Sequence, residues 1–311
     1  MRVLPIAQIL KKDLPEVGKK AFSLAELSQA KFPVPVGFVV SGQAFREFLE
    51  SHDIHIAIKS ELSRVNLEDL HSVDYASRVI QDLMLLHPIG EALNTEIFQQ
   101  FVQITSEFVA VRSSAFSLER QLTWSGELAT FLHIPATELA SKIKECWASL
   151  FSTRSLFYVL EQNQDMSGVT MAVIVQRMVE ARASGILYTA HPVNQDKNQM
   201  VVEAGFGLGE ALDDAAIVPD TYIVQKEPLG ILDKNISEQR LMIDVRRADS
   251  GTSPKEINAA TAVKQKLTDD QILELAGLAS RIEAFYQHPV EIEWAYDKEF
   301  FILQSRLMNL S

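Results

Sequence analysis

The chain has 311 residues, of which 47% are hydrophobic and 23% are charged, and its net charge is −12. This composition excludes a disordered chain, and the length suggests two domains or one large two-lobed unit. The acidic balance and the absence of any long basic run exclude a protein that binds nucleic acid through its phosphates. Cys146 is the only cysteine, which excludes a disulfide within the chain and a metal cluster of several cysteines. No apolar run reaches the ~20 residues that span a bilayer, so we expect a cytoplasmic protein without a membrane partner.

The first half of the chain is predicted to be mostly helical. Apolar residues at helical spacing indicate helices, and short apolar runs bounded by polar residues indicate strands. These patterns predict helices over 18–31, 41–49, 56–107 and 136–150, and strands over 38–40, 108–111 and 129–134. The strand over 108–111 is expected to end where Arg112, Ser113 and Ser114 begin a polar loop.

The second half of the chain is predicted to be mostly sheet. Strands are expected over 171–176, 184–188, 200–204 and 221–225, followed by a helix over 267–286. A closing hairpin is expected from 290–296 and 299–304. A helix-rich half followed by a sheet-rich half predicts an α+β fold of two lobes, which we place at 1–180 and 181–311.

Two basic positions could bind phosphate. Lys20 lies near the start of a predicted helix, where backbone N–H groups and the helix dipole favour an anion. Arg112 follows a buried strand and precedes two hydroxyl side chains, a combination suited to a phosphate group. A solvated lysine and a structural ion pair are the alternatives for these two side chains.

Two glycine-containing turns are less informative. Gly126, after Ser125, would allow the backbone to approach a ligand closely, although most Ser-Gly pairs form ordinary turns. The segment VEAGFGLGE (202–210) is a glycine-rich turn after a strand, but its glycine spacing is not that of a dinucleotide-binding loop.

The closing hairpin carries the strongest signal. Glu291 and Glu293 alternate with apolar residues and therefore face the same way, and Gln304 and Arg306 alternate on the partner strand. A carboxylate, an amide oxygen and a guanidinium on one face could hold a magnesium–phosphate group, because Mg²⁺ takes few protein oxygens and keeps substrate phosphates as ligands. Cross-strand pairing of glutamate with arginine is the alternative, and it accounts for two of these residues.

These clusters, in this order, resemble the ATP-binding domain of phosphoenolpyruvate synthase, pyruvate phosphate dikinase and rifampicin phosphotransferase. The resemblance is collinear and covers nearly the whole chain. The matching segments are VGKKAFSLAEL (17–27), PVPVGFVVSGQAF (33–45), VAVRSSA (109–115), ECWASLFSTRSLFY (145–158), AVIVQRMVEARASGILYTAHP (172–192), VEAGFGLGEAL (202–212), VPDTYIV (218–224) and HPVEIEWAYDKEFFILQSR (288–306).

The resemblance implies an ATP-grasp fold with Mg-ATP held between two lobes, and it implies roles for individual residues. Lys20, Arg112 and Arg306 would contact the phosphates of ATP and act in catalysis. The turn at Ser125 and Gly126, with Thr130, looks like the loop that covers the phosphates. Gln176, Met178 and Val179 look like the connecting strand on the adenine side. Glu293 and Gln304 match the magnesium positions, whereas Glu291 stands where the family usually has aspartate.

The resemblance also implies a partner. In the full enzymes this domain accompanies a phosphohistidine domain, and none of the seven histidines here lies in a Thr-Ser-His motif. We therefore expect an ATP-dependent phosphotransferase that passes a phosphoryl group to a histidine on a domain in cis or in trans, and through it to a small molecule such as pyruvate. The loop over 116–127 departs from the family pattern, as does His191. A self-contained kinase or ligase and a non-catalytic nucleotide-binding regulator therefore remain alternatives.

Overall fold

The computed structural model describes the whole chain except residues 118–127, 163–165, 247–248 and 310–311. It contains two compact units. The first unit comprises Met1–Ala25 and Val36–Met178, and the second comprises Glu26–Pro35 and Val179–Ser311. Within the described ranges, no helix is long and apolar enough to cross a membrane.

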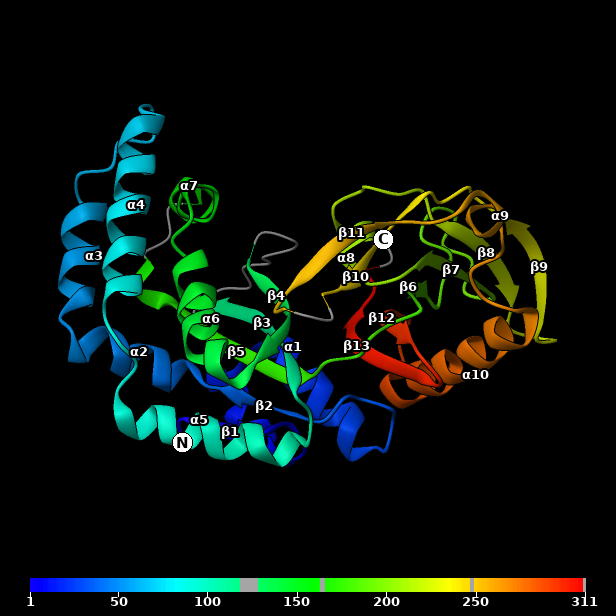
Figure 1. The fold of residues 1–311 in the computed structure, drawn as a ribbon, viewed down its shortest axis with the longest axis horizontal. Coiled ribbons are helices and arrows are strands. Elements are labelled where there is room, and N and C mark those ends of the chain that lie inside the picture. Colours follow the sequence, from blue (N-terminus) through cyan, green and yellow to red (C-terminus); the bar gives the residue numbers. More distant parts are fainter. Residues whose placement is uncertain (118–127, 163–165, 247–248, 310–311) are drawn as a thin grey trace. The chain divides into compact units, whose positions relative to one another are not determined.

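The first unit is built on a five-stranded antiparallel sheet (Figure 1). The strand order is β1 (Val3–Pro5), β2 (Gly37–Val40), β5 (Val169–Arg177), β3 (Phe108–Ser117) and β4 (Thr130–Pro135). Three short 3₁₀ helices are described, at Ile6–Gln8, Lys11–Asp13 and Met166–Gly168. The α-helices are α1 (Leu14–Gln29), which continues into the second unit, α2 (Gly42–Ser51), α3 (Ile54–Leu62), α4 (Leu70–Leu86), α5 (Glu91–Ile104), α6 (Ala136–Ser149) and α7 (Thr153–Glu161).

The two faces of this sheet have different environments. Alternate residues of the central strands, such as Val111 and Val175, belong to a large apolar core that also contains Phe45 and Trp147 of the helices. The intervening residues, which include Arg112, point to the opposite face. That opposite face is also buried at β5, where Ala172 and Ile174 are fully buried, but it carries the polar side chains of Arg112 and Ser114 as well.

The second unit contains a six-stranded antiparallel sheet and a separate two-stranded sheet (Figure 1). The larger sheet has the order β13 (Phe300–Leu307), β12 (Val290–Tyr296), β6 (Ala183–Tyr188), β7 (Gln199–Phe206), β8 (Asp220–Gln225) and β9 (Gly230–Asn235). The smaller one pairs β10 (Leu241–Val245) with β11 (Thr252–Glu256). The helices are α8 (Glu210–Asp213), α9 (Ala259–Ala262) and α10 (Asp269–Tyr286), and α10 packs on one face of the larger sheet around Tyr222 and Trp294.

The structure confirms the α+β class, since each unit combines helices with an antiparallel sheet. The segment 26–35 belongs to the second unit, because Leu27 joins its apolar core and the Ile302 amide donates to the Pro33 carbonyl at 2.8 Å. A lobe boundary at residue 180 stays a prediction.

Several predicted elements need correction. The helical region over 56–107 is divided into the three helices α3, α4 and α5. The strand expected to end before Arg112 runs on to Ser117, because the backbone from 112 to 117 continues to pair with residues 169–174 of β5. Helix α7 and strands β9, β10 and β11 were not expected from the sequence pattern.

Candidate functional site

Helix α1 is interrupted at Gly18 next to strand β3. Gly18 has φ 75° and ψ 167°, so the helical segment that carries Lys19 and Lys20 begins directly after it. The Ser114 hydroxyl donates to the Val17 carbonyl at 3.1 Å and ties this turn to the strand. A Cβ atom at position 18 would lie 2.7 Å from Cδ1 of Phe116, so the position requires glycine for both its conformation and its space. Lys20 therefore stands at the start of a helical segment held against β3.

Arg112 lies on the same face of β3 as Ser114, two residues away. It is paired in register with Ile174 of β5 on one side and with Thr130 of β4, an exposed residue, on the other. Ser113 faces the other way, and its hydroxyl donates to the Ala129 carbonyl at 2.7 Å. One sheet face thus brings Arg112 and Thr130 together and carries Ser114 beside the Gly18 turn. Ser125 and Gly126 lie outside the described residues.

The segment after β5 holds the residues expected beside adenine. Gln176 is buried and pairs in register with Ala110 on one side and Gly37 on the other. The Met178 amide donates to the Phe108 carbonyl at 3.2 Å, and the Val179 carbonyl accepts a hydrogen bond from the Ala181 amide at 2.9 Å. The first contact holds the backbone beside β3 as it leaves the sheet, and the second closes a three-residue turn centred on Glu180.

The β12–β13 hairpin has the register expected from its alternation. Glu291 lies opposite Arg306, and Glu293 lies opposite Gln304, just before a β-bulge. Arg306 Nη2 lies 2.7 Å from Glu291 Oε1, which is the cross-strand ion pair that the sequence left open as an alternative. Gln304 Oε1 is buried and has no hydrogen-bond partner among the described residues. The Gln304 amide oxygen therefore lies opposite Glu293 and is available to coordinate a cation.

A third carboxylate, Glu203 of β7, shares this face and was not singled out from the sequence. It pairs in register with Ile186, which in turn pairs with Glu293. Burial and the negative charge of Glu291 raise the pKa of Glu203 above its ordinary value. Burial and the charges of Glu203 and Glu291 also raise the pKa of Tyr188 to about 12. The alternation in VVEAG on β7 indicates which way Glu203 faces, but only the strand order shows that it lies on the same face as Glu293.

The electrostatics of the face favour a cation. It presents three carboxylates, and one of them already pairs with Arg306. Over the described ranges there is no cluster of three or more His, Cys, Asp or Glu side chains arranged to hold a metal ion. Glu293 and the unpartnered Gln304 oxygen nevertheless supply two hard oxygen donors, a small set that suits Mg²⁺ when a phosphate completes the coordination.

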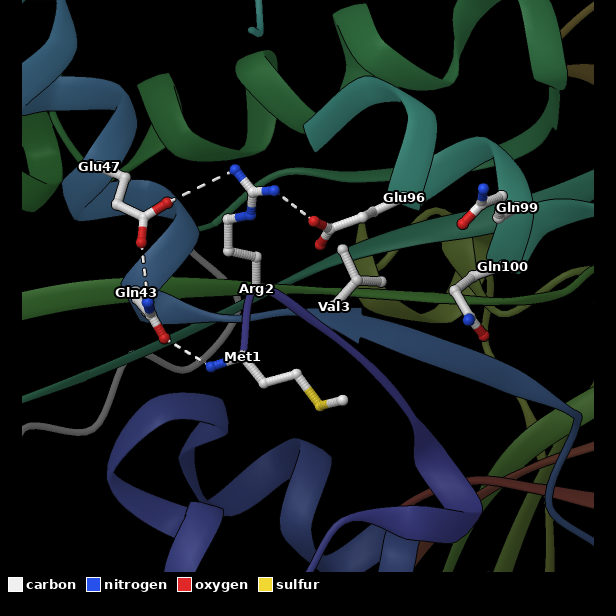
Figure 2. A pocket seen from close by; sticks show the side chains of 8 residues that line it. All are labelled: Met1, Arg2, Val3, Gln43, Glu47, Glu96, Gln99 and Gln100. Carbon is white, nitrogen blue, oxygen red and sulfur yellow. Dashed lines mark hydrogen bonds and ion pairs between the residues drawn. The ribbon is translucent and has the colours of Figure 1, made fainter. Parts of the chain in front are cut away.

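A separate cavity of about 480 Å³ lies in the first unit, and none of the predicted site residues lines it (Figure 2). Arg2 lies between Glu47 and Glu96 and pairs with both, so its charge is already compensated. The lining residues are Met1, Arg2, Val3, Gln43, Glu47, Glu96, Gln99 and Gln100.

Comparison with known proteins identifies the family. The family described as the pyruvate phosphate dikinase AMP/ATP-binding domain matches residues 14–310. The chain belongs to this family. The resemblance inferred from the sequence motifs is therefore confirmed, and the division into two α+β units agrees with a two-lobed ATP-grasp fold.

The relatives that match this chain are longer proteins. A probable phosphoenolpyruvate synthase of Archaeoglobus fulgidus is 35% identical, over 98% of this chain and 41% of the relative. Rifampicin phosphotransferase of Bacillus subtilis is 35% identical, over 98% of this chain and 35% of the relative. A probable phosphoenolpyruvate synthase of Methanocaldococcus jannaschii is 34% identical, over 96% of this chain and 26% of the relative. The chain thus spans less than half the length of these relatives.

Proposed function

We propose that this chain binds Mg-ATP and transfers a phosphoryl group to a histidine of a phosphohistidine domain. The observation that carries the proposal is the family match over residues 14–310, which makes the chain an AMP/ATP-binding domain. The names of its relatives support phosphoryl transfer, since they are phosphoenolpyruvate synthases and a rifampicin phosphotransferase. Lys20, Arg112 and Arg306 are the proposed phosphate-binding and catalytic residues.

Charge and alignment would supply the catalysis. Phosphoryl transfer asks the protein to neutralise the phosphate oxygens and to hold donor and acceptor in line. The Gly18 turn, fixed by the 3.1 Å bond from Ser114 to Val17, supports a role for the following amides and Lys20 in phosphate binding. Arg112 and Thr130, adjacent on the same sheet face, are proposed to bind further phosphate oxygens. Ser125 and Gly126 are proposed to cover the phosphates, and Gln176, Met178 and Val179 to line the adenine side.

Glu293 and Gln304 are the residues that would hold Mg²⁺. Their oxygens lie on opposed positions of one hairpin, and Gln304 Oε1 is buried with no partner among the described residues. When bound, the ion would neutralise charge on the phosphate oxygens. Arg306 already pairs with Glu291, so we propose that it exchanges part of this contact for a phosphate.

The acceptor is proposed to lie on a further domain, in cis or in trans, of a cytoplasmic enzyme. The greater length of the relatives supports such a domain. The histidine would pass the phosphoryl group on to a small molecule such as pyruvate, as the name phosphoenolpyruvate synthase suggests for the relatives.

Isotope transfer tests this proposal. The chain is incubated with Mg-ATP labelled on its β- and γ-phosphates, with and without the phosphohistidine domain of a relative, and a partner lacking its acceptor histidine serves as the control. We expect label on the intact partner that is stable to base and labile to acid, and only slow ATP cleavage by the chain alone. Attack at the β-phosphorus would release AMP and place a pyrophosphoryl group on the histidine, which must then lose phosphate to leave phosphohistidine. Attack at the γ-phosphorus would release ADP and give phosphohistidine directly. Rapid turnover of a small molecule without any partner would instead favour a self-contained kinase or ligase.

A further inference from the structure

An ion pair behind the Gly18 turn connects three elements of the first unit. Arg46 of α2 lies with Nη2 at 2.6 Å from Oε1 of Glu16 in α1. The same guanidinium donates from Nη1 to the Thr170 hydroxyl of β5 at 3.3 Å. Thr170 is buried, whereas the two charged side chains are a little over one-third exposed.

These contacts lie next to the turn proposed to bind phosphate. Glu16 precedes Gly18 by two residues, on the part of α1 before the interruption. Thr170 is paired in register with Phe116, and the Phe116 ring is the group that a Cβ at Gly18 would meet. A Cβ at Gly42 would lie 2.7 Å from Thr170 Oγ1, so the Arg46 contact is made in a tightly packed place.

The charge balance makes Arg46 important for the position of Glu16. The second carboxylate oxygen, Oε2, is buried and has no hydrogen-bond partner among the described residues. Loss of Arg46 would leave this carboxylate without its compensating charge, and the start of α1 would have to move to bring it to water. A partly exposed ion pair contributes little to global stability, so we expect the effect on local geometry to be the larger one.

We propose that Glu16 and Arg46 are positioning residues for phosphate binding. They hold the first part of α1 against α2 and β5, and so keep the turn at Gly18 and the amides after it in one arrangement. Ser114 fixes the same turn from the side of β3 through Val17. The expected effect on ATP binding rests on the proposed function, whereas the expected effect on the arrangement of the Gly18 turn does not.

Hydrogen exchange and ATP titration of the same variants test the two consequences separately. The variants are Glu16→Gln, Arg46→Met, their combination, and Arg46→Lys. The matched control is Glu96→Gln, which breaks a partly exposed arginine–glutamate pair elsewhere in the first unit. Amide exchange over residues 14–24 is measured without nucleotide, and the ATP dissociation constant is measured with Mg²⁺.

We expect Arg46→Met to speed exchange over 14–24 and to weaken ATP binding by about tenfold or more, because small displacements of binding groups are costly. Glu16→Gln should have the smaller effect, Arg46→Lys should recover part of the loss, and the double variant should be no worse than Arg46→Met. The control should change both quantities by no more than about twofold. Unchanged exchange over 14–24 in Arg46→Met would overturn the proposal. Failure of the unaltered chain to bind ATP would instead refute the proposed function, and the exchange data would still decide whether the pair fixes the turn.

Discussion

The Ser114 hydroxyl donates a 3.1 Å hydrogen bond to the carbonyl of Val17, across 97 residues of sequence. The bond joins strand β3 to the interruption in helix α1, so that the amides after Gly18 lie beside the strand that carries Arg112. Two of the basic groups proposed to bind phosphate, Lys20 and Arg112, therefore belong to elements in direct contact. Their placement depends on Gly18, which is the residue that permits the close approach.

Gly18→Ala is expected to lower the free energy of unfolding by about 1–3 kcal/mol, because alanine disfavours the left-handed conformation and its Cβ would meet Phe116. ATP binding should weaken as well, since the turn must shift. Gly277→Ala is the control, because beyond the backbone of α10 itself no atom lies within 4 Å of a Cβ built there, and it should stabilise the chain by up to about 1 kcal/mol. Urea unfolding measures the change in the free energy of unfolding for both variants. Equal changes at the two positions would argue against a constrained turn at Gly18.

Glu293→Gln is expected to reduce Mg²⁺-dependent ATP binding more than Glu291→Gln does. Glu293 lies opposite the unpartnered oxygen of Gln304, whereas Glu291 pairs with Arg306. Titration of each variant with ATP, at several Mg²⁺ concentrations, measures the difference. If ATP binding by Glu291→Gln were the more sensitive to Mg²⁺, the metal position proposed at Glu293 would be wrong.

Glu203→Gln is expected to stabilise the fold at neutral pH. The folded state raises the pKa of Glu203 through burial and the charge of Glu291, so the folded chain holds this proton more tightly than the unfolded chain. As pH rises from the ordinary pKa of glutamate through the raised one, the fold loses stability, and above that range the loss is complete. The gain in melting temperature should therefore be larger near pH ~8 than near pH ~4. Exposed Glu299→Gln serves as control, and an equal gain for Glu203→Gln at both pH values would contradict the assignment.

Asp220→Asn is expected to destabilise the second unit by about 3–5 kcal/mol, because it removes the partner of a buried charge. Asp220 Oδ1 lies 2.7 Å from Lys266 Nζ, both side chains are fully buried, and Tyr222 donates to the same carboxylate at 2.7 Å. Asp269→Asn breaks the exposed pair with Lys234 and should change the stability far less, because solvent screens that pair. Thermal unfolding distinguishes the two, and similar losses would mean that Asp220 is not the partner that compensates Lys266.

The sequence was most informative where alternation alone fixes geometry. On the hairpin, the alternation of Glu291 and Glu293 with apolar residues correctly predicted that both carboxylates face one way. Strand β11 was missed because Pro254 and the polar residues around it argue against a strand, although a two-stranded sheet leaves an edge on which proline is tolerated.

Other features depend on contacts that no local pattern reveals. Arg112 reads as a loop residue because its neighbours are polar, yet pairing with β5 keeps it within a strand. The local pattern around Glu203 does not show what the residue faces, and only the strand order β12, β6, β7 brings it onto the face of Glu293. The contact between Gly18 and Phe116 likewise joins distant segments, so the sequence predicts Lys20 as a phosphate-binding residue but does not predict the group that holds its turn.

Calorimetric titration with ATP, in the presence and absence of Mg²⁺, tests the central claim most directly. We predict that the folded chain binds one ATP in a Mg²⁺-dependent manner, and that Lys20→Met in the first unit and Glu293→Gln in the second both weaken this binding. At an ATP concentration of about 100 times the dissociation constant, binding should also stabilise the fold by about 2.7 kcal/mol. Absence of any heat of binding or thermal stabilisation at millimolar Mg-ATP, in a sample shown to be folded, would contradict the account.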